Sequence, residues 1–169
     1  SIIAMSFLLN LASIALLVLA ERESDTHKAE AAHMLAQRVA VLEVETFIKS
    51  KLPRQNIAER RGVAELIVDA ATEFRLSPLL LARVAIAESA LNHNAVGDGG
   101  KSHGIFQLQE FWVKEIPFLR NKQDLYRAHL NIRAGAWVLR YMADRCGDDS
   151  ESMLSCFNAG ENNREAGRQ

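Results

Sequence analysis

The chain opens with an uncharged apolar segment. Residues 1–20 carry no Asp, Glu, Lys, Arg or His, and their polar breaks are Ser1, Ser6, Asn10 and Ser13. About 20 apolar residues suffice to cross a bilayer as a helix. The segment therefore predicts a transmembrane anchor at residues 1–20. A cleaved signal sequence, with "VLA" before Glu21 as its cleavage site, and a buried core helix are the alternatives.

A charged helical pattern follows the apolar segment. Met34, Val41 and Ile48 recur every seven residues, with Val44 on the same face. A helix uses such a stripe to pack on a partner helix, which would allow a homo-oligomer or a larger envelope or virion complex. A solvated amphipathic stalk is the alternative. We assign residues 21–61 to a helical stalk and linker.

From residue 62 onward the pattern predicts a compact, mainly α domain. Apolar residues recur at helical spacing over residues 63–74, and Ser77 followed by Pro78 is a strong signal for the start of a helix. A long helix over residues 128–146 is expected to end at Gly147, with a last helix after it. No clear alternating strand pattern appears. The predicted domain covers residues 62–169.

Charge and composition narrow the classes of partner. The 20 basic and 21 acidic residues give a net charge of −1, and no basic stripe with interleaved aromatics appears, so nucleic acid is not expected. His93 and His103 lie in one loop without a third ligand at fixed spacing, so we expect them to be solvated and predict no metal and no cofactor. Cys146 and Cys156 predict a disulfide between the last two helices, with two buried free thiols as the alternative.

One acidic residue stands in an apolar run. Glu88 lies between Val84 and Leu91, near the end of a predicted helix. A partly desolvated carboxylate tends to keep its proton, and a protonated carboxyl near neutral pH is what cleavage of a glycosidic bond requires. A Glu88 that points into solvent or pairs with Arg83 is the alternative.

Four short motifs occur in order around and after this residue. They are "ES" at residues 88–89, "GIFQL" at 104–108, "NIRAG" at 131–135 and "CFNAG" at 156–160. Together they resemble the catalytic domain of the soluble lytic transglycosylases, over roughly residues 62–160. The resemblance implies a lysozyme-like helical fold and peptidoglycan glycan strands as the substrate.

The resemblance also implies site residues. Glu88 matches the single catalytic acid and base, and Ser89 the neighbour that helps to hold an N-acetyl or hydroxyl group. The residues that match the turns lining the sugar cleft are Gly104, Gln107, Asn158 and Gly160. Phe157 stands where the family usually has Tyr, so the apolar wall is kept and a hydroxyl is lost. Nine residues follow Gly160, where the family continues into a further helix, so a C-terminally shortened domain is expected.

The expected activity is that of a peptidoglycan lytic transglycosylase, anchored in the inner membrane with its domain in the periplasm or carried by a phage particle. It would cleave between N-acetylmuramic acid and N-acetylglucosamine and form a 1,6-anhydro ring. A muramidase using Asp98 is one alternative, although the glycines around Asp98 favour a turn. A non-catalytic glycan-binding or structural component is another. Trp137 is expected in the core, and Trp112 either in the core or stacked on sugar.

Overall fold

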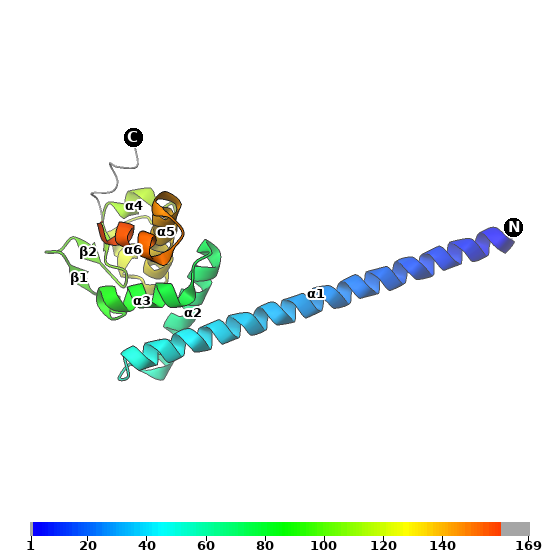
Figure 1. Cartoon of the computed structure of the whole chain (residues 1–169), viewed down its shortest axis with the longest axis horizontal. Helices are drawn as coiled ribbons and strands as arrows, with labels where there is room; N and C mark the ends of the chain where they lie inside the picture. Colours follow the sequence, from blue (N-terminus) through cyan, green and yellow to red (C-terminus); the bar gives the residue numbers. More distant parts are fainter. Residues whose placement is uncertain (1, 160–169) are drawn as a thin grey trace. The chain divides into compact units, whose positions relative to one another are not determined.

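The computed structural model describes the backbone of residues 2–159 and the side chains of residue 19 and residues 21–159. The chain divides into two units, residues 1–39 and residues 40–169. One long helix, α1 (Ile2–Lys51), supplies the described part of the first unit and the beginning of the second (Figure 1).

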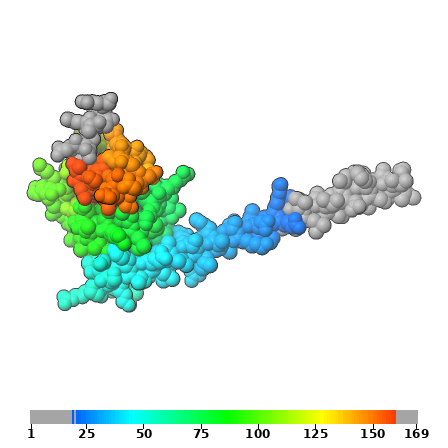
Figure 2. Space-filling view, viewed as in Figure 1, coloured from blue at the N-terminus to red at the C-terminus, as the bar shows by residue number. Residues whose placement is uncertain are grey.

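The first unit is helical and its described surface is open. All side chains of residues 21–39 are exposed, as the blue part of the helix in Figure 2 shows. Among the residues whose side chains are described, no helix is both long and apolar enough to cross a membrane. The predicted anchor, residues 1–20, lies outside those residues except for Leu19 and stays a prediction.

The heptad stripe divides between two environments. Val41, Val44 and Ile48 are buried in the core of the second unit, whereas Met34 is 64% exposed. The spacing of the three buried residues puts them on one face of α1, and that face packs on the chain's own domain. The compact unit begins at Ala40, because the end of α1 packs into it.

The second unit is mainly α, as predicted. After the end of α1 its elements are, in order, α2 (Ile57–Phe74), α3 (Pro78–Ser89), β1 (Val96–Gly97), β2 (Ser102–His103), β3 (Leu108–Gln109), α4 (Trp112–Glu115), the 3₁₀ helix η1 (Lys122–Tyr126), α5 (Ala128–Cys146) and α6 (Ser150–Ala159). Helix α5 packs on α2 and α6, and α2 also packs on α3.

The predicted helix ends are confirmed. The Ser77 hydroxyl accepts a hydrogen bond from the Leu80 amide, and Pro78 is the first residue of α3. Gly147 follows α5 with φ 119°, and its amide donates to the Ala143 carbonyl. These side chains and turns satisfy backbone groups that a helix end leaves without intrahelical partners.

A small antiparallel sheet was not predicted. Strands β1, β2 and β3 are neighbours in that order, and the pairs Val96–His103 and His103–Leu108 set their register. Each strand has two residues, which is too short for an alternating pattern to appear in the sequence. The sheet carries the loop after Glu88 back toward α3.

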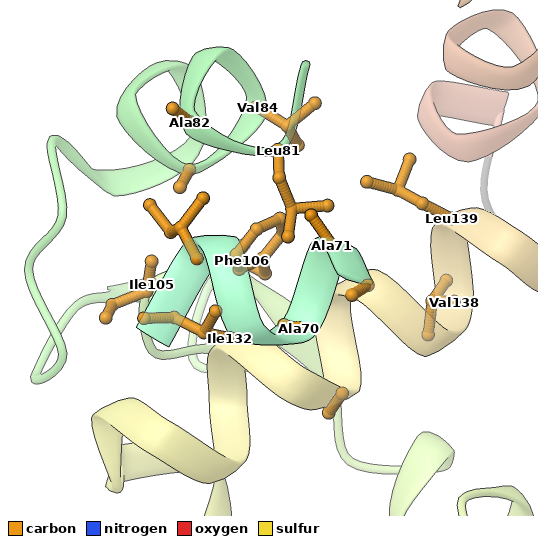
Figure 3. Close-up of a cluster of buried hydrophobic side chains, with 14 of the residues drawn as sticks. Ala70, Ala71, Leu81, Ala82, Val84, Ile105, Phe106, Ile132, Val138 and Leu139 are labelled. Carbon is orange, nitrogen blue, oxygen red and sulfur yellow. The ribbon is translucent and has the colours of Figure 1, made fainter. Parts of the chain in front are cut away.

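The core forms where the turn after β2 meets the helices. Phe106 is fully buried and belongs to the same apolar cluster as Leu81 and Ala71, which Figure 3 draws. Gly135 of α5 makes room for this ring, since a Cβ there would lie 2.2 Å from Phe106 Cγ. The glycine of the "NIRAG" motif thus lets α5 approach the turn that follows β2.

Candidate active site

Glu88 stands in the last turn of α3. The helix ends because Ala90 adopts a left-handed conformation with φ 53°. The side chain of Glu88 is half-buried, and Arg83 does not neutralise it: the Arg83 guanidinium lies over the Phe47 ring at 5.7 Å. Among the described residues, Glu88 has no ion-pair partner.

Glu88 opens into a pocket of about 170 Å³. The wall combines carboxylates, amides and apolar side chains from α3, the small sheet, α4, α5 and α6. Its residues are Glu88, Asp98, Ser102, Gln107, Leu108, Gln109, Phe111, Trp112, Val138, Met142, Phe157 and Asn158. A largely preformed concave site with a few convergent polar groups is typical of a ligand-binding pocket.

The environment of Glu88 favours its protonated form. Burial raises the pKa of the Glu88 carboxyl above its ordinary value, and the negative charge of Asp98 raises it further. Burial disfavours the charged form of Glu88 by itself, and Asp98 disfavours it by like-charge repulsion. Glu88 therefore keeps its proton to a higher pH than an exposed glutamate does, which suits a general acid.

Asp98 belongs to the pocket as well as to the turn. It has φ 48° between β1 and β2, and its carboxylate accepts a hydrogen bond from the Ser102 hydroxyl. The sequence pattern favoured the turn, and the glycines around Asp98 do build one. The same turn brings the carboxylate to the pocket wall, so the two interpretations are compatible.

Gln107 is held at the opposite end of the sheet. Its side-chain amide nitrogen, Nε2, donates a hydrogen bond to the Gly104 carbonyl at 2.8 Å, and its backbone has φ 46°. Gly97 leaves room for this amide, since a Cβ there would lie 2.2 Å from Gln107 Oε1 and the side chain would have to shift. The hydrogen bond and the space at Gly97 together fix the amide in the pocket wall.

Gly104 and Ser89 act on the protein itself and are not among the described residues that line the pocket. Gly104 has φ 75°, and a Cβ would lie 2.1 Å from the Leu125 carbonyl oxygen. The Ser89 hydroxyl donates to the Ile105 carbonyl at 2.8 Å and so ties the end of α3 to the turn after β2. Both residues hold the turn that carries Gln107.

Sequence reasoning assigned no role to Asn131, although the residue opens the "NIRAG" motif. Asn131 is fully buried; its Oδ1 accepts from the Phe106 amide, and its Nδ2 donates to the carbonyls of Leu125 and His103. Three bonds from one side chain anchor the turn between β2 and β3. The available signal was a polar residue on the buried face of a predicted helix, since such a residue needs internal partners.

His103 contradicts the expectation of a solvated side chain. It is 1% exposed, and its Nδ1 shares a hydrogen bond with the Tyr126 hydroxyl at 2.8 Å. Burial lowers its pKa and Lys122 lowers it further, against a smaller opposite effect of Glu110. His93 is exposed, as expected. The described residues contain no group of three or more His, Cys, Asp or Glu side chains placed to hold a metal ion.

Helix α6 supplies the last wall of the pocket. Phe157 and Asn158 lie near its end and line the pocket. The predicted disulfide is confirmed: Cys146 of α5 and Cys156 of α6 are bonded, with their Cα atoms 6.4 Å apart. The bond fixes α6 beside α5 one residue before Phe157.

Aromatic side chains continue the wall toward α5. Trp112 is buried and lines the pocket, with the Phe111 ring 4.7 Å away. Trp137 was expected in the core but is half-buried. Its ring stacks on that of Tyr141, with the ring centres 5.4 Å apart. The cluster stiffens the α4–α5 side of the pocket through ring packing.

Residues 65–169, more than half of the chain, match the family model of the transglycosylase SLT domain. The chain belongs to the SLT transglycosylase family. No curated protein matches the sequence at a significant level. The match to the SLT domain covers the whole described pocket wall, from Glu88 to Asn158. At the level of the family, this SLT domain is of the lytic type that binds and cleaves peptidoglycan, and its mainly helical unit fits the lysozyme-like fold.

Proposed function

We propose that this SLT domain is a lytic transglycosylase that cleaves the β-1,4 bond between N-acetylmuramic acid and N-acetylglucosamine. The observation that carries the proposal is the half-buried Glu88 in the pocket, with its pKa raised by burial. Because its pKa is raised, the carboxyl keeps its proton to a higher pH than an exposed glutamate does, and it can act first as the general acid.

The proposed reaction needs one carboxyl group. Glu88 gives its proton to the glycosidic oxygen as the bond from that oxygen to C1 of the muramic acid breaks, which releases the N-acetylglucosamine end. The acetamido group of the same sugar stabilises the cationic centre at C1. The Glu88 carboxylate then takes the proton of the C6 hydroxyl, whose oxygen bonds to C1 and closes the 1,6-anhydro ring.

The other proposed site residues bind the sugar or shape the pocket that holds it. The amides of Gln107 and Asn158 line the pocket and offer donor and acceptor atoms that suit acetamido groups. Phe157 provides an apolar wall that helps to keep the site desolvated. Ser89 and Gly104 act through the turn that positions Gln107.

A muramidase is the second candidate, and one observation favours it. Asp98 lines the same pocket as Glu88, and its charge acts on the Glu88 carboxyl. A second carboxylate in a glycosidase site can activate water or serve as the nucleophile, and the product would then have a reducing end.

The substrate and the disulfide support a site of action outside the cytoplasm, because peptidoglycan lies there and disulfides persist in oxidising compartments. We propose that residues 1–20 anchor the protein in the inner membrane, with the domain in the periplasm. A phage particle that delivers the domain to the envelope is the alternative.

Digestion of purified sacculi tests the activity. The full chain, Glu88→Gln and the control Glu43→Gln, an exposed glutamate of α1, are incubated with sacculi and the released fragments are analysed by mass spectrometry. We expect anhydro-muramic ends from the wild type and the control, and none from Glu88→Gln. Release by Glu88→Gln at a rate near that of the wild type would exclude Glu88 as the acid. Reducing ends would favour the muramidase.

A further inference from the structure

A second concave surface is lined by the turn between α1 and α2 and by Ala90, the residue after α3; the turn itself lies below α3 in Figure 1. We call it the turn groove; it measures about 500 Å³ and is lined by Lys51, Leu52, Pro53, Arg54, Gln55 and Ala90. It shares no lining residue with the pocket of Glu88. Residues 51–55 also precede the part of the chain that matches the SLT domain, residues 65–169, so the groove is largely an addition to that domain.

The turn groove is positively charged. Lys51 and Arg54 are exposed, no carboxylate lines the groove, and neither cation has an ion-pair partner among the described residues. Behind the lining, the Arg60 side chain is 6% exposed and donates to the Gln55 carbonyl, and it too lacks a carboxylate partner in the described part of the chain. The start of α2 at Ile57 adds little to this charge, because Asn56 caps it and Glu59 lies in its first turn. An anionic group is the complementary ligand.

The rest of the lining suits a peptide. Leu52, Pro53 and Ala90 form an apolar wall. Gln55 also lines the groove, and a side-chain amide can exchange hydrogen bonds with the backbone of a peptide. A short peptide with a free C-terminus combines a carboxylate, amide N–H groups and apolar side chains.

The groove lies within reach of the reaction site. Ala90 follows Glu88 by two residues, so their Cα atoms are at most about 7.6 Å apart, and four or five extended residues span about 15 Å. Peptidoglycan carries short stem peptides, with free carboxylates, on its muramic acid. We propose that the turn groove binds the stem peptide through its carboxylate, so that the domain cleaves peptide-bearing strands faster than bare ones. This inference rests on the proposed function for its substrate.

Two substrates separate this role from the chemistry. The full chain is assayed on intact sacculi and on glycan strands stripped of peptides by an amidase. The double variant Lys51→Ala/Arg54→Ala is compared with the control Lys49→Ala/Lys114→Ala, which removes two exposed cations outside the groove. We expect the groove variant to lose about fivefold in rate on sacculi, as two exposed ion pairs allow, and nothing on bare strands. Equal losses on both substrates, or no loss on either, would overturn the proposal.

A binding measurement keeps the test independent of activity. The probe is a fluorescent synthetic stem pentapeptide, compared with its C-terminal amide and with vesicles containing phosphatidylglycerol. We expect the acid to bind more tightly than the amide, and Lys51→Ala/Arg54→Ala to remove the difference. Peptide binding by a chain that digests neither substrate would refute the proposed transglycosylase activity and would still support peptide binding by the groove. Groove-dependent binding of vesicles without binding of the peptide would assign the groove to lipid instead.

Discussion

Gly104 is the position where we expect the largest effect of adding a single methyl group. At φ 75°, an alanine there has to adopt a left-handed conformation, which by itself costs about 1–2 kcal/mol. Its Cβ would also lie 2.1 Å from the Leu125 carbonyl oxygen and 2.4 Å from Asn131 Nδ2. Neither atom can move away freely, because Asn131 Nδ2 donates a hydrogen bond to the Leu125 carbonyl oxygen.

The steric part can be separated from the conformational part. Gly99 has φ 65°, and a Cβ added there would meet nothing within 4 Å, so Gly99→Ala carries the conformational cost alone. Relieving the overlap at Gly104 requires Asn131 to shift, which weakens up to three buried hydrogen bonds at about 1 kcal/mol or more each. We expect about 1–2 kcal/mol for Gly99→Ala and about 3–6 kcal/mol for Gly104→Ala.

Urea unfolding at neutral pH, with the disulfide intact, measures both variants. A loss of about 3–6 kcal/mol is a large part of the stability of a typical domain, so Gly104→Ala is examined at low temperature, where partial folding can be detected. Equal destabilisation of the two variants would refute the reasoning, since it would mean that the turn relaxes around the methyl group without disturbing Asn131.

Four further predictions concern the charges and the disulfide. Burial and Asp98 raise the pKa of Glu88, so folding opposes the ionisation of this carboxyl. Glu88→Gln should therefore raise the thermal midpoint at neutral pH, and this gain should vanish below the ordinary pKa of 4.5. An equal gain at all pH values would contradict this. Asp98→Asn should lower that pKa and move the alkaline limb of the lysis profile to lower pH, whereas an unchanged limb would remove the coupling. Because the pKa of His103 is lowered, the folded state binds a proton on this ring less readily than the unfolded state does. The stability of the protein should therefore fall as pH drops below the ordinary pKa of 6.5. In thermal melts over a pH series, His103→Gln should not show this fall. Reduction of Cys146–Cys156 should lower stability by about 2–3 kcal/mol, and thiol labelling of unreduced, unfolded protein should find no reactive thiols.

The helices of the second unit and the position of Glu88 could be predicted from the sequence, because their signals are local. Ser77 and Pro78 specify the start of α3 within a few residues of chain. An acidic residue in an apolar run needs only its neighbours to be recognised. The pairing of the two cysteines also followed from local order, since two helices joined by a short connection bring residues near the junction together.

The remaining features depend on contacts between distant residues. His103 and Tyr126 are 23 residues apart, and Asn131 reaches Phe106 across 25 residues, so neither contact has a local signal. The heptad stripe of α1 divides for a related reason: Val41 and Met34 look equivalent in the sequence, and only the packing of the domain against Val41 distinguishes them. Burial of a polar or apolar side chain is decided by what folds against it.

The bond between α5 and α6 also determines when the pocket becomes complete. Helix α6 has ten residues, too few to hold a stable helix alone, and it supplies Phe157 and Asn158 to the pocket wall. In a reducing compartment the cysteines stay apart, and α6 relies on its packing against α5 alone. A newly made chain would thus carry Glu88 in a site with one loose side, and oxidation would close that side. Under the function proposed above, this order of events would tie full activity to arrival in an oxidising compartment.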